Sequence, residues 1–490
     1  MASVAAGSEP IETRLFINNE VSISLLFRNS SSNKTFDVIY PYTKEVIAHV
    51  QEADVKDVDD AVAAASAAFP AWRDLGVDKR GAYLRKIADL LLEANDELAR
   101  LETLSTGRPV SQYIDAVMSA DMFRYFADGA WNIQGTASTN TPGILSMTVK
   151  EPYGVAGLII PWNFPLMNFS AKMAPALAAG NTVVLKSSEK APLTSLYAAS
   201  LFAKAGFPPG VVNVLSGFGT PTGAALAEHM SVRCISFTGS SLTGQKIHAA
   251  AAKSNLKHVH SELGGKSPAI VFDDADLESA AAQTQFSIKL NMGQLCAATS
   301  RVYVQDTVAD KFIELYRAML PAVQMGDPLD PKTSHGPQID AAQYARVKGY
   351  LDIGEKDGRL TTGGDGGDGY FVKPTIFENV PQDSRLVQEE VFGPVVVINT
   401  FSTEAEGIQK ANDSEFGLYA SIFTKDLDRA VRVSQAVESG TVCVNCTSPT
   451  NTKDAAVGGY KMSGNGREGF LFSIDSFLQT KTILIKAGLS

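Results

Sequence analysis

The chain has 490 residues, of which 45% are hydrophobic and 20% are charged, and its formal net charge is -10 at pH 7. A chain of this length and composition folds into a globular protein with a large core and two or more domains. The negative charge argues against a nucleic-acid partner, which would require a basic surface. The longest apolar runs are too short to span a membrane, so no membrane partner is expected.

The first residues lack the patterns of a secretory or a mitochondrial targeting peptide, so we expect a cytoplasmic protein. The 4 cysteines in so long a chain give no disulfide framework. Two of them, Cys443 and Cys446, have CxxC spacing. Because there is neither a second pair to complete a zinc site nor the helix start of a redox motif, we interpret this spacing as coincidence.

The segment 54–106 carries apolar residues at helical spacing and predicts two helices, the second open to interruption at Asn95-Asp96. From residue 154 to 272 the pattern changes to short β-branched runs separated by helical stretches. This alternation predicts a parallel, doubly wound α/β sheet. Its expected strands are Val155–Ile160, Thr182–Leu185, Val211–Leu215, Cys234–Phe237 and Ala269–Phe272.

Ligands of such sheets bind beyond the carboxyl ends of the strands. Three polar stretches follow directly on an expected strand end, namely Pro161–Asn163, Lys186–Glu189 and Thr238–Ser240. We therefore expect a ligand site at this edge of the sheet.

A second α/β region is expected from residue 265 to 462, with strands at Val302–Val304, Val395–Ile398, Ser421–Phe423 and Val442–Val444. The stretch Thr361–Gly369 is glycine-rich, but its two aspartates would repel a phosphate, so we interpret it as a surface turn. Ile144–Lys150 and Thr480–Lys486 are strand-like and lie outside both regions.

Four short motifs carry the chemistry, namely Pro161–Pro165, Ser261–Pro268 with Glu262, Asn291–Arg301 with Cys296, and Glu389–Pro394. A thiol is a nucleophile only as thiolate, and a nearby carboxylate can serve as its base or activate water. Taken singly, each motif has an ordinary explanation as a buried cysteine or a glycine turn. In this order, over a match from about Leu15 to Lys486, they resemble the aldehyde dehydrogenase superfamily, of the NAD(P)-dependent, hydrolytic, non-CoA-acylating type.

The resemblance implies two doubly wound α/β domains plus a small β oligomerisation arm. The NAD-binding domain would comprise residues 1–133 and 153–264, and the catalytic domain residues 265–465. Residues 134–152 and 478–490 would form the arm, which joins subunits in this family. A homodimer or homotetramer is therefore expected.

By the same resemblance Cys296 is the nucleophile that adds to the aldehyde carbonyl. The Asn163 side-chain amide and the backbone N–H of Cys296 would hold the oxyanion. Glu262 would activate the water that releases the acid, and its presence favours hydrolysis over transfer to CoA. Lys172 and Glu468 match positions proposed as a proton relay and a helper carboxylate; otherwise they are a snorkelling lysine and a surface glutamate.

The alternation of His258, His260 and Glu262 would place all three on one face of a strand, which makes a zinc site conceivable. No water-activating motif accompanies them, and the motif around Glu262 already accounts for that residue. We therefore expect no metal. Ser261 departs from the family, where this position is normally apolar.

For the cofactor, the stretch Phe237–Gly244 follows a strand and opens a helix, so its amides could hold a pyrophosphate. The resemblance makes Lys186 and Glu189 the pair that contacts the adenosine ribose. A carboxylate there would repel a 2′-phosphate, so NAD is favoured over NADP. Glu390 would hold the nicotinamide ribose. The remaining expected contacts are Ile159, Pro161, Trp162, Gly219, Phe237, Gly239, Ser240, Leu263 and Phe392.

The expected substrate tunnel differs from that of relatives for small aldehydes, which commonly line it with aromatic side chains. Small or flexible side chains widen an apolar cavity, so we predict a bulky or long apolar aldehyde. The tunnel positions are Phe164, Met167, Asn168, Ala171, Leu290 and Val457.

The N-terminal segment Val21–Ser32 is longer and more apolar than the family usually has. A lengthened hairpin, a disordered flap or a gene-prediction artefact would each account for it.

The sequence thus predicts an NAD-dependent oxidation of an aldehyde to an acid through a thioester on Cys296. One alternative is a cysteine-dependent esterase or thioesterase without a nucleotide. It is disfavoured because no histidine stands near a catalytic-looking motif, as such enzymes normally require. A non-catalytic scaffold is disfavoured by the presence of Cys296, Glu262 and Asn163 together.

Overall fold

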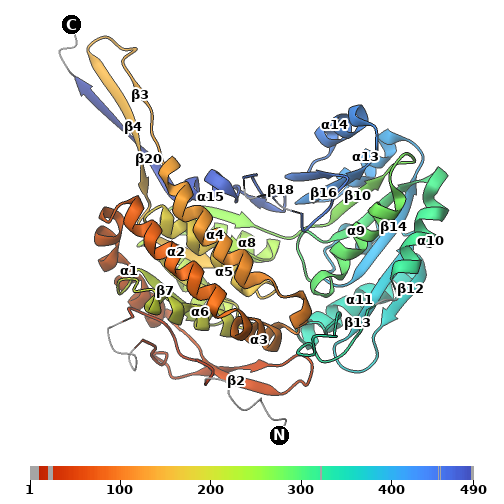
Figure 1. Cartoon of the computed structure of the whole chain (residues 1–490), viewed down its shortest axis with the longest axis horizontal. Helices are drawn as coiled ribbons and strands as arrows, with labels where there is room; N and C mark the ends of the chain where they lie inside the picture. Colours follow the sequence, from red (N-terminus) through yellow and green to blue (C-terminus); the bar gives the residue numbers. More distant parts are fainter. Residues whose placement is uncertain (1–9, 20–25, 321–322, 451, 453, 487–490) are drawn as a thin grey trace.

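The computed structural model describes residues 10–19, 26–320, 323–450, 452 and 454–486. Two parallel sheets dominate the structure, and a narrow arm projects from the first (Figure 1). In the first sheet the strands lie in the order β19-β9-β8-β5-β6-β7, all parallel except β19. Their bounds are β5 Val155–Ile159, β6 Thr182–Ser187, β7 Val212–Ser216, β8 Val232–Thr238, β9 His258–Glu262 and β19 Gly464–Asn465.

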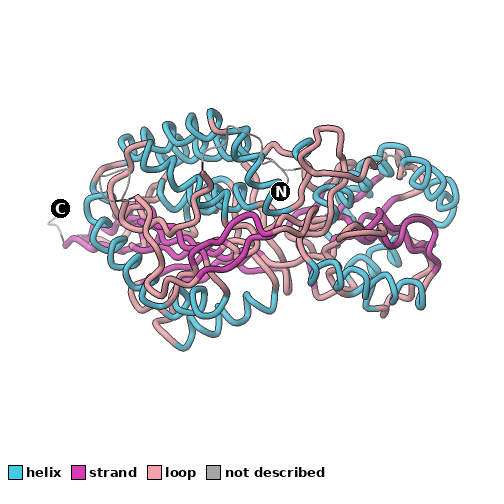
Figure 2. The backbone as a smooth tube through the Cα atoms, turned by 90° about the horizontal axis from the view of Figure 1, so that it is seen from below, coloured by secondary structure: helices cyan, strands magenta, loops and turns pink. Residues whose placement is uncertain are grey.

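Alternating side chains of these strands enter two separate cores, as the two-residue period of a strand requires. Ala156 and Leu158 of β5 face the helices α2 to α6, whereas Val155 and Ile159 face α1, α7 and α8. Figure 2 shows these strands as a layer between helices. The helices are α1 Val55–Asp74, α2 Val77–Glu93, α3 Asn95–Thr106, α4 Asp115–Gly129, α5 Pro165–Ala178, α6 Leu193–Lys204, α7 Ala224–Glu228 and α8 Ser241–Lys253.

The chain runs from β5 outward to β6 and β7, then crosses to β8 on the other side of β5. The loops that follow β5 and β8 therefore flank the point where the strand order reverses, which is where open α/β sheets bind ligands. This places Pro161–Asn163 and Gly239–Ser240 at that crevice.

The second sheet has the strand order β12-β13-β14-β11-β10-β16-β17, parallel except for the antiparallel pair β12 and β13. Its strands are β10 Ser267–Val271, β11 Thr299–Gln305, β12 Arg359–Asp365, β13 Val372–Glu378, β14 Val395–Phe401, β16 Tyr419–Phe423 and β17 Thr441–Val444. Helices α9 and α10 pack on one face, and α11 to α14 on the other. Their bounds are α9 Leu277–Lys289, α10 Ala309–Met319, α11 Ala341–Asp357, α12 Arg385–Gln388, α13 Glu404–Asn412 and α14 Leu427–Ala436.

The arm is a three-stranded antiparallel sheet of β3 (Ala137–Ser138), β4 (Ile144–Pro152) and β20 (Leu478–Lys486). It confirms that Ile144–Lys150 and Thr480–Lys486 are strands outside the two larger sheets. The short helix α15 (Phe470–Asp475) precedes β20, and two small pairs complete the strands: β1 Thr35–Ile39 with β2 Val46–Gln51, and β15 Phe416–Gly417 with β18 Tyr460–Lys461. We propose two domains built on the two sheets, with the arm as a third unit and bounds as expected from the sequence.

Part of Val21–Ser32 lies outside the described residues. On either side of the gap, Leu15 and Arg28 exchange backbone hydrogen bonds of 2.9 Å each way. The Phe16 and Phe27 rings also pack edge to face, 5.3 Å apart. The chain on the two sides of the gap is therefore paired, and the three interpretations of the segment between them stay open.

Segment 54–106 forms three helices, because the interruption that the sequence left open does occur: α2 ends at Glu93 and α3 begins at Asn95. Two other expectations about local structure were wrong. Ala269–Phe272 contributes to β10 in the second sheet, and β9 takes its place in the first. Much of Thr361–Gly369 is strand β12 rather than a turn, because it pairs with β13. No helix among the described residues is long and apolar enough to cross a bilayer.

Candidate active site

The loop that presents Cys296 has an unusual backbone. Helix α9 ends at Lys289, and Asn291, Met292 and Gly293 all have positive φ, at 47°, 55° and 72°. A positive φ is uncommon for a residue with a side chain, and costs on the order of 1–3 kcal/mol each where the surroundings enforce it. A Cβ on Gly293 would also lie 2.1 Å from the Gly393 carbonyl oxygen. This turn therefore needs glycine.

Buried amides brace this loop against the start of α5. The Asn291 Nδ2 donates to the Asn163 carbonyl at 2.8 Å, and the Asn163 Nδ2 donates to the Gln294 carbonyl at 3.0 Å. The Gln294 Oε1 accepts from the Ile339 backbone N–H at 3.1 Å. Asn163 is thus joined to the Cys296 loop in both directions, and hydrogen-bond partners in the described residues use one of its two amide hydrogens.

Cys296 is half-buried at the point where the two sheets meet. A Cβ on Gly265 would lie 2.3 Å from the Cys296 carbonyl oxygen, so the glycine lets the two segments touch. Burial, with the Glu390 and Glu262 carboxylates adding to it, raises the pKa of the Cys296 thiol to about 12. The resting side chain is therefore a thiol that needs a base to become a nucleophile.

Glu262 ends β9 and is buried beside a second carboxylate, that of Glu468. The pKa of Glu262 is held well above its usual value, by burial first and then by Glu468, against the opposing effect of Lys172 and Arg467. Lys172 on α5 donates to the Glu468 Oε1 at 2.7 Å and to the Ser236 Oγ at 3.0 Å. The structure therefore brings Glu262, Lys172 and Glu468 into one cluster.

The two carboxylates of this cluster are in opposite states. Burial acts to raise the pKa of Glu468, but Lys172 and His260 outweigh it and lower that pKa to about 2. Glu468 is thus ionised, whereas the raised pKa of Glu262 favours the protonated form of its carboxyl. Adjacent carboxylates whose pKa values are shifted in opposite directions are typical of acid–base sites.

His260 belongs to the same cluster, although the sequence did not predict an acid–base role for it. Its Nε2 lies 3.6 Å from the Glu262 Oε1 and 3.4 Å from the Glu468 Oε1. The argument that no histidine stands near a catalytic-looking motif was therefore wrong. The two-residue spacing from Glu262 on a strand was the signal, but it was used only to weigh a metal.

The expected nucleotide contacts gather at the carboxyl ends of β5, β6 and β8. Lys186 ends β6 with its Nζ 3.9 Å from the Glu189 Oε2. Burial lowers the pKa of Lys186 to about 8, although Glu189 acts in the opposite direction. Ser240 caps α8 by accepting from the Thr243 N–H at 3.3 Å. A cation, a carboxylate and the start of a helix together match the groups of a dinucleotide.

Glycines keep this crevice open for a ligand. A Cβ on Gly239 would lie 2.5 Å from the Phe237 ring, and one on Gly244 would lie 2.8 Å from Leu263. Gly219 is exposed in a short helical turn after β7, and a Cβ added to it would meet nothing within 4 Å. Backbone can therefore approach a bound group closely here.

A third group of expected contacts lies next to the nucleophile. Glu390 accepts from the Gly265 N–H at 2.9 Å, and burial raises its pKa to about 7. The rings of Trp162 and Phe392 meet edge to face at 5.3 Å. Pro161 adjoins Trp162, and Ile159 ends β5 with its side chain in the core.

The expected tunnel positions are mostly half-buried. Met167, Asn168 and Ala171 lie on one side of α5, and the Asn168 amide folds back onto the Phe164 carbonyl at 2.9 Å. The Arg108 guanidinium lies 4.7 Å above the Phe164 ring. Leu290 opens the strained turn. Val457 packs with Cys296 in a small apolar cluster.

That cluster also contains Cys443 and Cys446, so the CxxC pair lies near the nucleophile. All 4 cysteines are free. Within the described ranges, no three His, Cys, Asp or Glu side chains are arranged to hold a metal. His258 instead stacks on Tyr153, with the ring centroids 5.8 Å apart.

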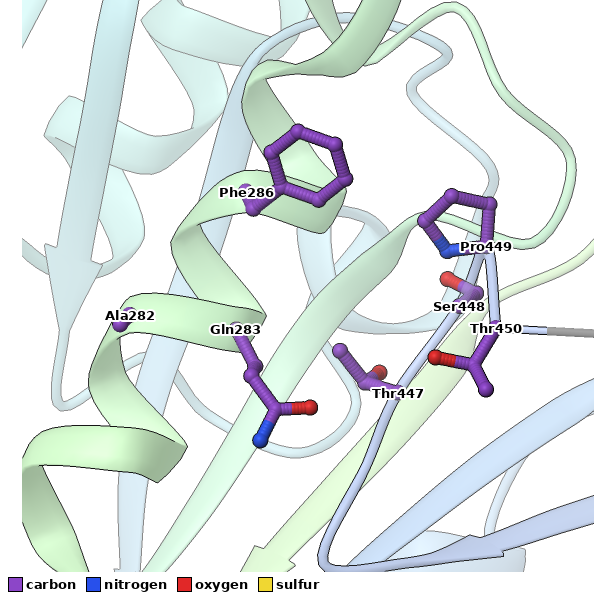
Figure 3. Close-up of a pocket in the computed structure, with 7 residues that line it drawn as sticks. All are labelled: Ala282, Gln283, Phe286, Thr447, Ser448, Pro449 and Thr450. Carbon is purple, nitrogen blue, oxygen red and sulfur yellow. The ribbon is translucent and has the colours of Figure 1, made fainter.

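A separate cavity of about 420 Å³ opens between α9 and the loop after β17 (Figure 3). None of the predicted site residues lines it. Its lining consists of Ala282, Gln283, Phe286, Thr447, Ser448, Pro449 and Thr450.

Comparisons with known proteins agree with this geometry. The model of the aldehyde dehydrogenase family matches residues 27–483. The chain is 46% identical to an aldehyde dehydrogenase of Emericella nidulans, over 97% of this chain and 95% of that protein. It is 44% identical to human retinal dehydrogenase 2, over 97% and 92%.

A solved structure of the indole-3-acetaldehyde dehydrogenase of P. syringae, a mutant in complex with NAD+ and IAA, aligns with a TM-score of 0.94. The two are 39% identical, over 98% of this chain and 97% of that one. These matches confirm the family resemblance and the mixed α/β fold with parallel sheets.

Proposed function

The chain belongs to the aldehyde dehydrogenase family, and we propose that it oxidises a bulky or long apolar aldehyde to its carboxylic acid with NAD. The observation that carries this proposal is the braced approach of Asn163 to the Cys296 loop, with Glu262 close enough to perturb the thiol. A nucleophile, an oxyanion donor and a base would thereby lie close together.

In the first half of the reaction, a base removes the thiol proton of Cys296. The sulfur adds to the aldehyde carbon, and the Asn163 amide and the Cys296 N–H stabilise the oxyanion. When bound, NAD supplies the hydride acceptor that converts this thiohemiacetal into a thioester.

In the second half, Glu262 as carboxylate takes a proton from water, and the water oxygen attacks the thioester carbon. The carbon–sulfur bond then breaks, the acid departs and the sulfur recovers its proton. Lys172 and Glu468 would hold the charge balance around Glu262 during this step.

For the nucleotide, we propose that Lys186 and Glu189 bind the adenosine ribose and that Glu390 binds the nicotinamide ribose. The start of α8 would hold the pyrophosphate, and Trp162 and Phe392 would flank the ring. The Glu189 carboxylate supports NAD over NADP, because it would repel a 2′-phosphate.

The substrate class rests on the side chains of the expected tunnel. Met167 and Ala171 leave more room than aromatic rings would, and the Asn168 amide is already satisfied by a backbone carbonyl. The names of two relatives, a retinal and an indole-3-acetaldehyde dehydrogenase, accord with a bulky apolar aldehyde.

We also propose a homodimer or homotetramer assembled through the arm. Leu484 and Ile485 on the outer strand β20 are exposed there, as an unpaired apolar edge would be before association. Sedimentation of a variant that ends at residue 477 would test this. A cytoplasmic location is part of the same proposal, and cell fractionation would test it.

The deciding experiment measures NADH formation by the purified protein with NAD or NADP, across linear, aryl and bulky terpenoid aldehydes, beside a Cys296→Ala variant. We expect turnover with NAD that vanishes in the variant, and poor use of acetaldehyde. A strong preference for acetaldehyde would contradict the substrate class. Ester hydrolysis dependent on Cys296 without any NADH would favour the esterase.

A further inference from the structure

His260 occupies a position that the proposed reaction has not yet used. Its imidazole is 3% exposed, and the Nε2 faces Glu262 at 3.6 Å and Glu468 at 3.4 Å. Neither ring nitrogen makes a direct hydrogen bond to another group in the described part of the chain. A buried imidazole without hydrogen bonds is costly, so its place between two carboxylates calls for an explanation.

A tight backbone cover holds the imidazole in this place. Strand β19 pairs with β9, and the chain around it passes over His260 and Glu262. A Cβ on Gly466 would lie 2.0 Å from the His260 Nδ1, and one on Gly458 would lie 2.8 Å from the Glu262 Oε1. The ring therefore cannot swing away from the carboxylates.

The charge balance of the cluster shows what the imidazole can do. Lys172 pairs with the ionised Glu468 at 2.7 Å. Burial beside that carboxylate favours a proton on Glu262, whose Oε1 lies 3.6 Å from the His260 Nε2. To act as a base Glu262 must lose that proton. If the proton left the cluster, a second negative charge would remain in a buried site beside Glu468, at a large cost in free energy.

The other charged and titratable groups around the cluster interact with other partners. Arg467 donates to the carbonyls of Gly459 and Gly466. The His248 Nε2 on α8 lies 3.2 Å from the Ser261 hydroxyl. The His260 imidazole, by contrast, faces the Glu262 Oε1 with its Nε2 at 3.6 Å and can take up a proton.

We propose that His260 accepts the proton of Glu262 and so converts that residue into the catalytic base. The proton moves from the Glu262 carboxyl to the His260 Nε2, and the resulting imidazolium lies between two carboxylates with no change in net charge. This inference rests on the proposed function, since it concerns the hydrolysis of an acyl group on Cys296.

The cycle then balances. Glu262 takes a proton from water, the hydroxide adds to the thioester, and the same proton passes to the departing Cys296 sulfur. Glu262 next recovers its original proton from His260. His260 acts through Glu262 and touches no substrate, so it is a positioning residue.

The test replaces His260 by glutamine, which keeps a hydrogen-bond donor but cannot take up a proton. In the full-length variant enzyme with NAD and aldehyde, we expect a burst of about one NADH per subunit. This equals the NADH that the wild type forms in its first turnover. Steady-state turnover near neutral pH should fall about tenfold or more and recover as the pH rises. His260→Asn serves as a second variant if the first fails to fold.

His258→Gln is the matched control, because His258 lies two residues away on the same strand with an exposed ring. It should keep the wild-type pH profile. An unchanged pH profile without a burst in His260→Gln would overturn the proposal. So would an equal loss of burst and turnover at every pH, which indicates a structural role.

A second readout separates this proposal from the proposed function. Hydrolysis of 4-nitrophenyl acetate acylates Cys296 without a nucleotide, so it reports the same deacylation even if no aldehyde yields NADH. The same pH-dependent loss in His260→Gln is expected there. If the wild type neither oxidises an aldehyde nor hydrolyses 4-nitrophenyl acetate, both proposals are refuted.

Discussion

The two sides of the site are built in different ways. The nucleophile side consists of uncharged amides and a strained turn, Asn291–Gly293, that fix the position of Cys296. The base side consists of charged groups at the end of β9 that set the protonation state of Glu262. In the proposed reaction, geometry therefore governs formation of the acyl group, and charge governs its release. A variant on one side should leave the other step intact.

The largest effect on turnover is expected from a substitution on the base side. Glu262→Gln cannot take a proton from water, so steady-state turnover should fall by about 10²–10⁴. The NADH burst of the first turnover should survive, because the nucleophile side is untouched. Stopped-flow absorbance of NADH measures both; loss of the burst would mean that Glu262 also deprotonates the thiol.

The next effect is expected from Asn163→Ala. Removal of one oxyanion donor costs about 10²–10³ in kcat, and here it also frees the Cys296 loop. The burst itself should slow, in contrast to Glu262→Gln. A fast burst in this variant would show that Asn163 is only a structural brace.

The strained turn can be tested through stability. Gly293→Ala combines a positive φ with a clash against Gly393, and we expect a loss of roughly 3 kcal/mol or more in the free energy of unfolding. Gly76→Ala is the matched control, because Gly76 has φ 83° but nothing within 4 Å of a new Cβ. Its loss should be about 1–2 kcal/mol. Urea titrations measure both losses of stability. Equal losses in the two variants would show that the structure relieves the clash at Gly293.

The smallest effect concerns pH. The active forms of Cys296 and Glu262 are both deprotonated, and both pKa values lie above their ordinary ones. The burst rate should therefore rise with pH across the neutral range, by up to about tenfold per unit, because the Cys296 thiol has a pKa of about 12. In the proposed cycle His260 takes up the Glu262 proton inside the cluster, so the steady state should rise less steeply with pH than the burst rate. A flat burst rate below neutral pH would contradict the raised thiol pKa.

The sequence predicted the parts whose signals are local. Strand ends followed by polar loops located Asn163, Lys186 and Ser240 at one edge of a sheet, and the arm strands were found by their pattern. The interpretation of Glu468 as a helper carboxylate came from the resemblance, since no spacing indicates it. The placement of β10 was missed because a buried parallel strand looks the same in either sheet. His260 was missed because its partner Glu468 lies far along the chain.

The pairing of β19 with β9 has a consequence during synthesis on the ribosome. At about 5–20 residues per second, the roughly 200 residues between Glu262 and Glu468 take on the order of 10 to 40 s to translate. Until then a nascent chain carries Cys296 without the strand that covers Glu262 and His260. A prematurely terminated chain would be left with an exposed thiol and an incomplete base. Translation to the end is therefore a condition for activity as well as for folding.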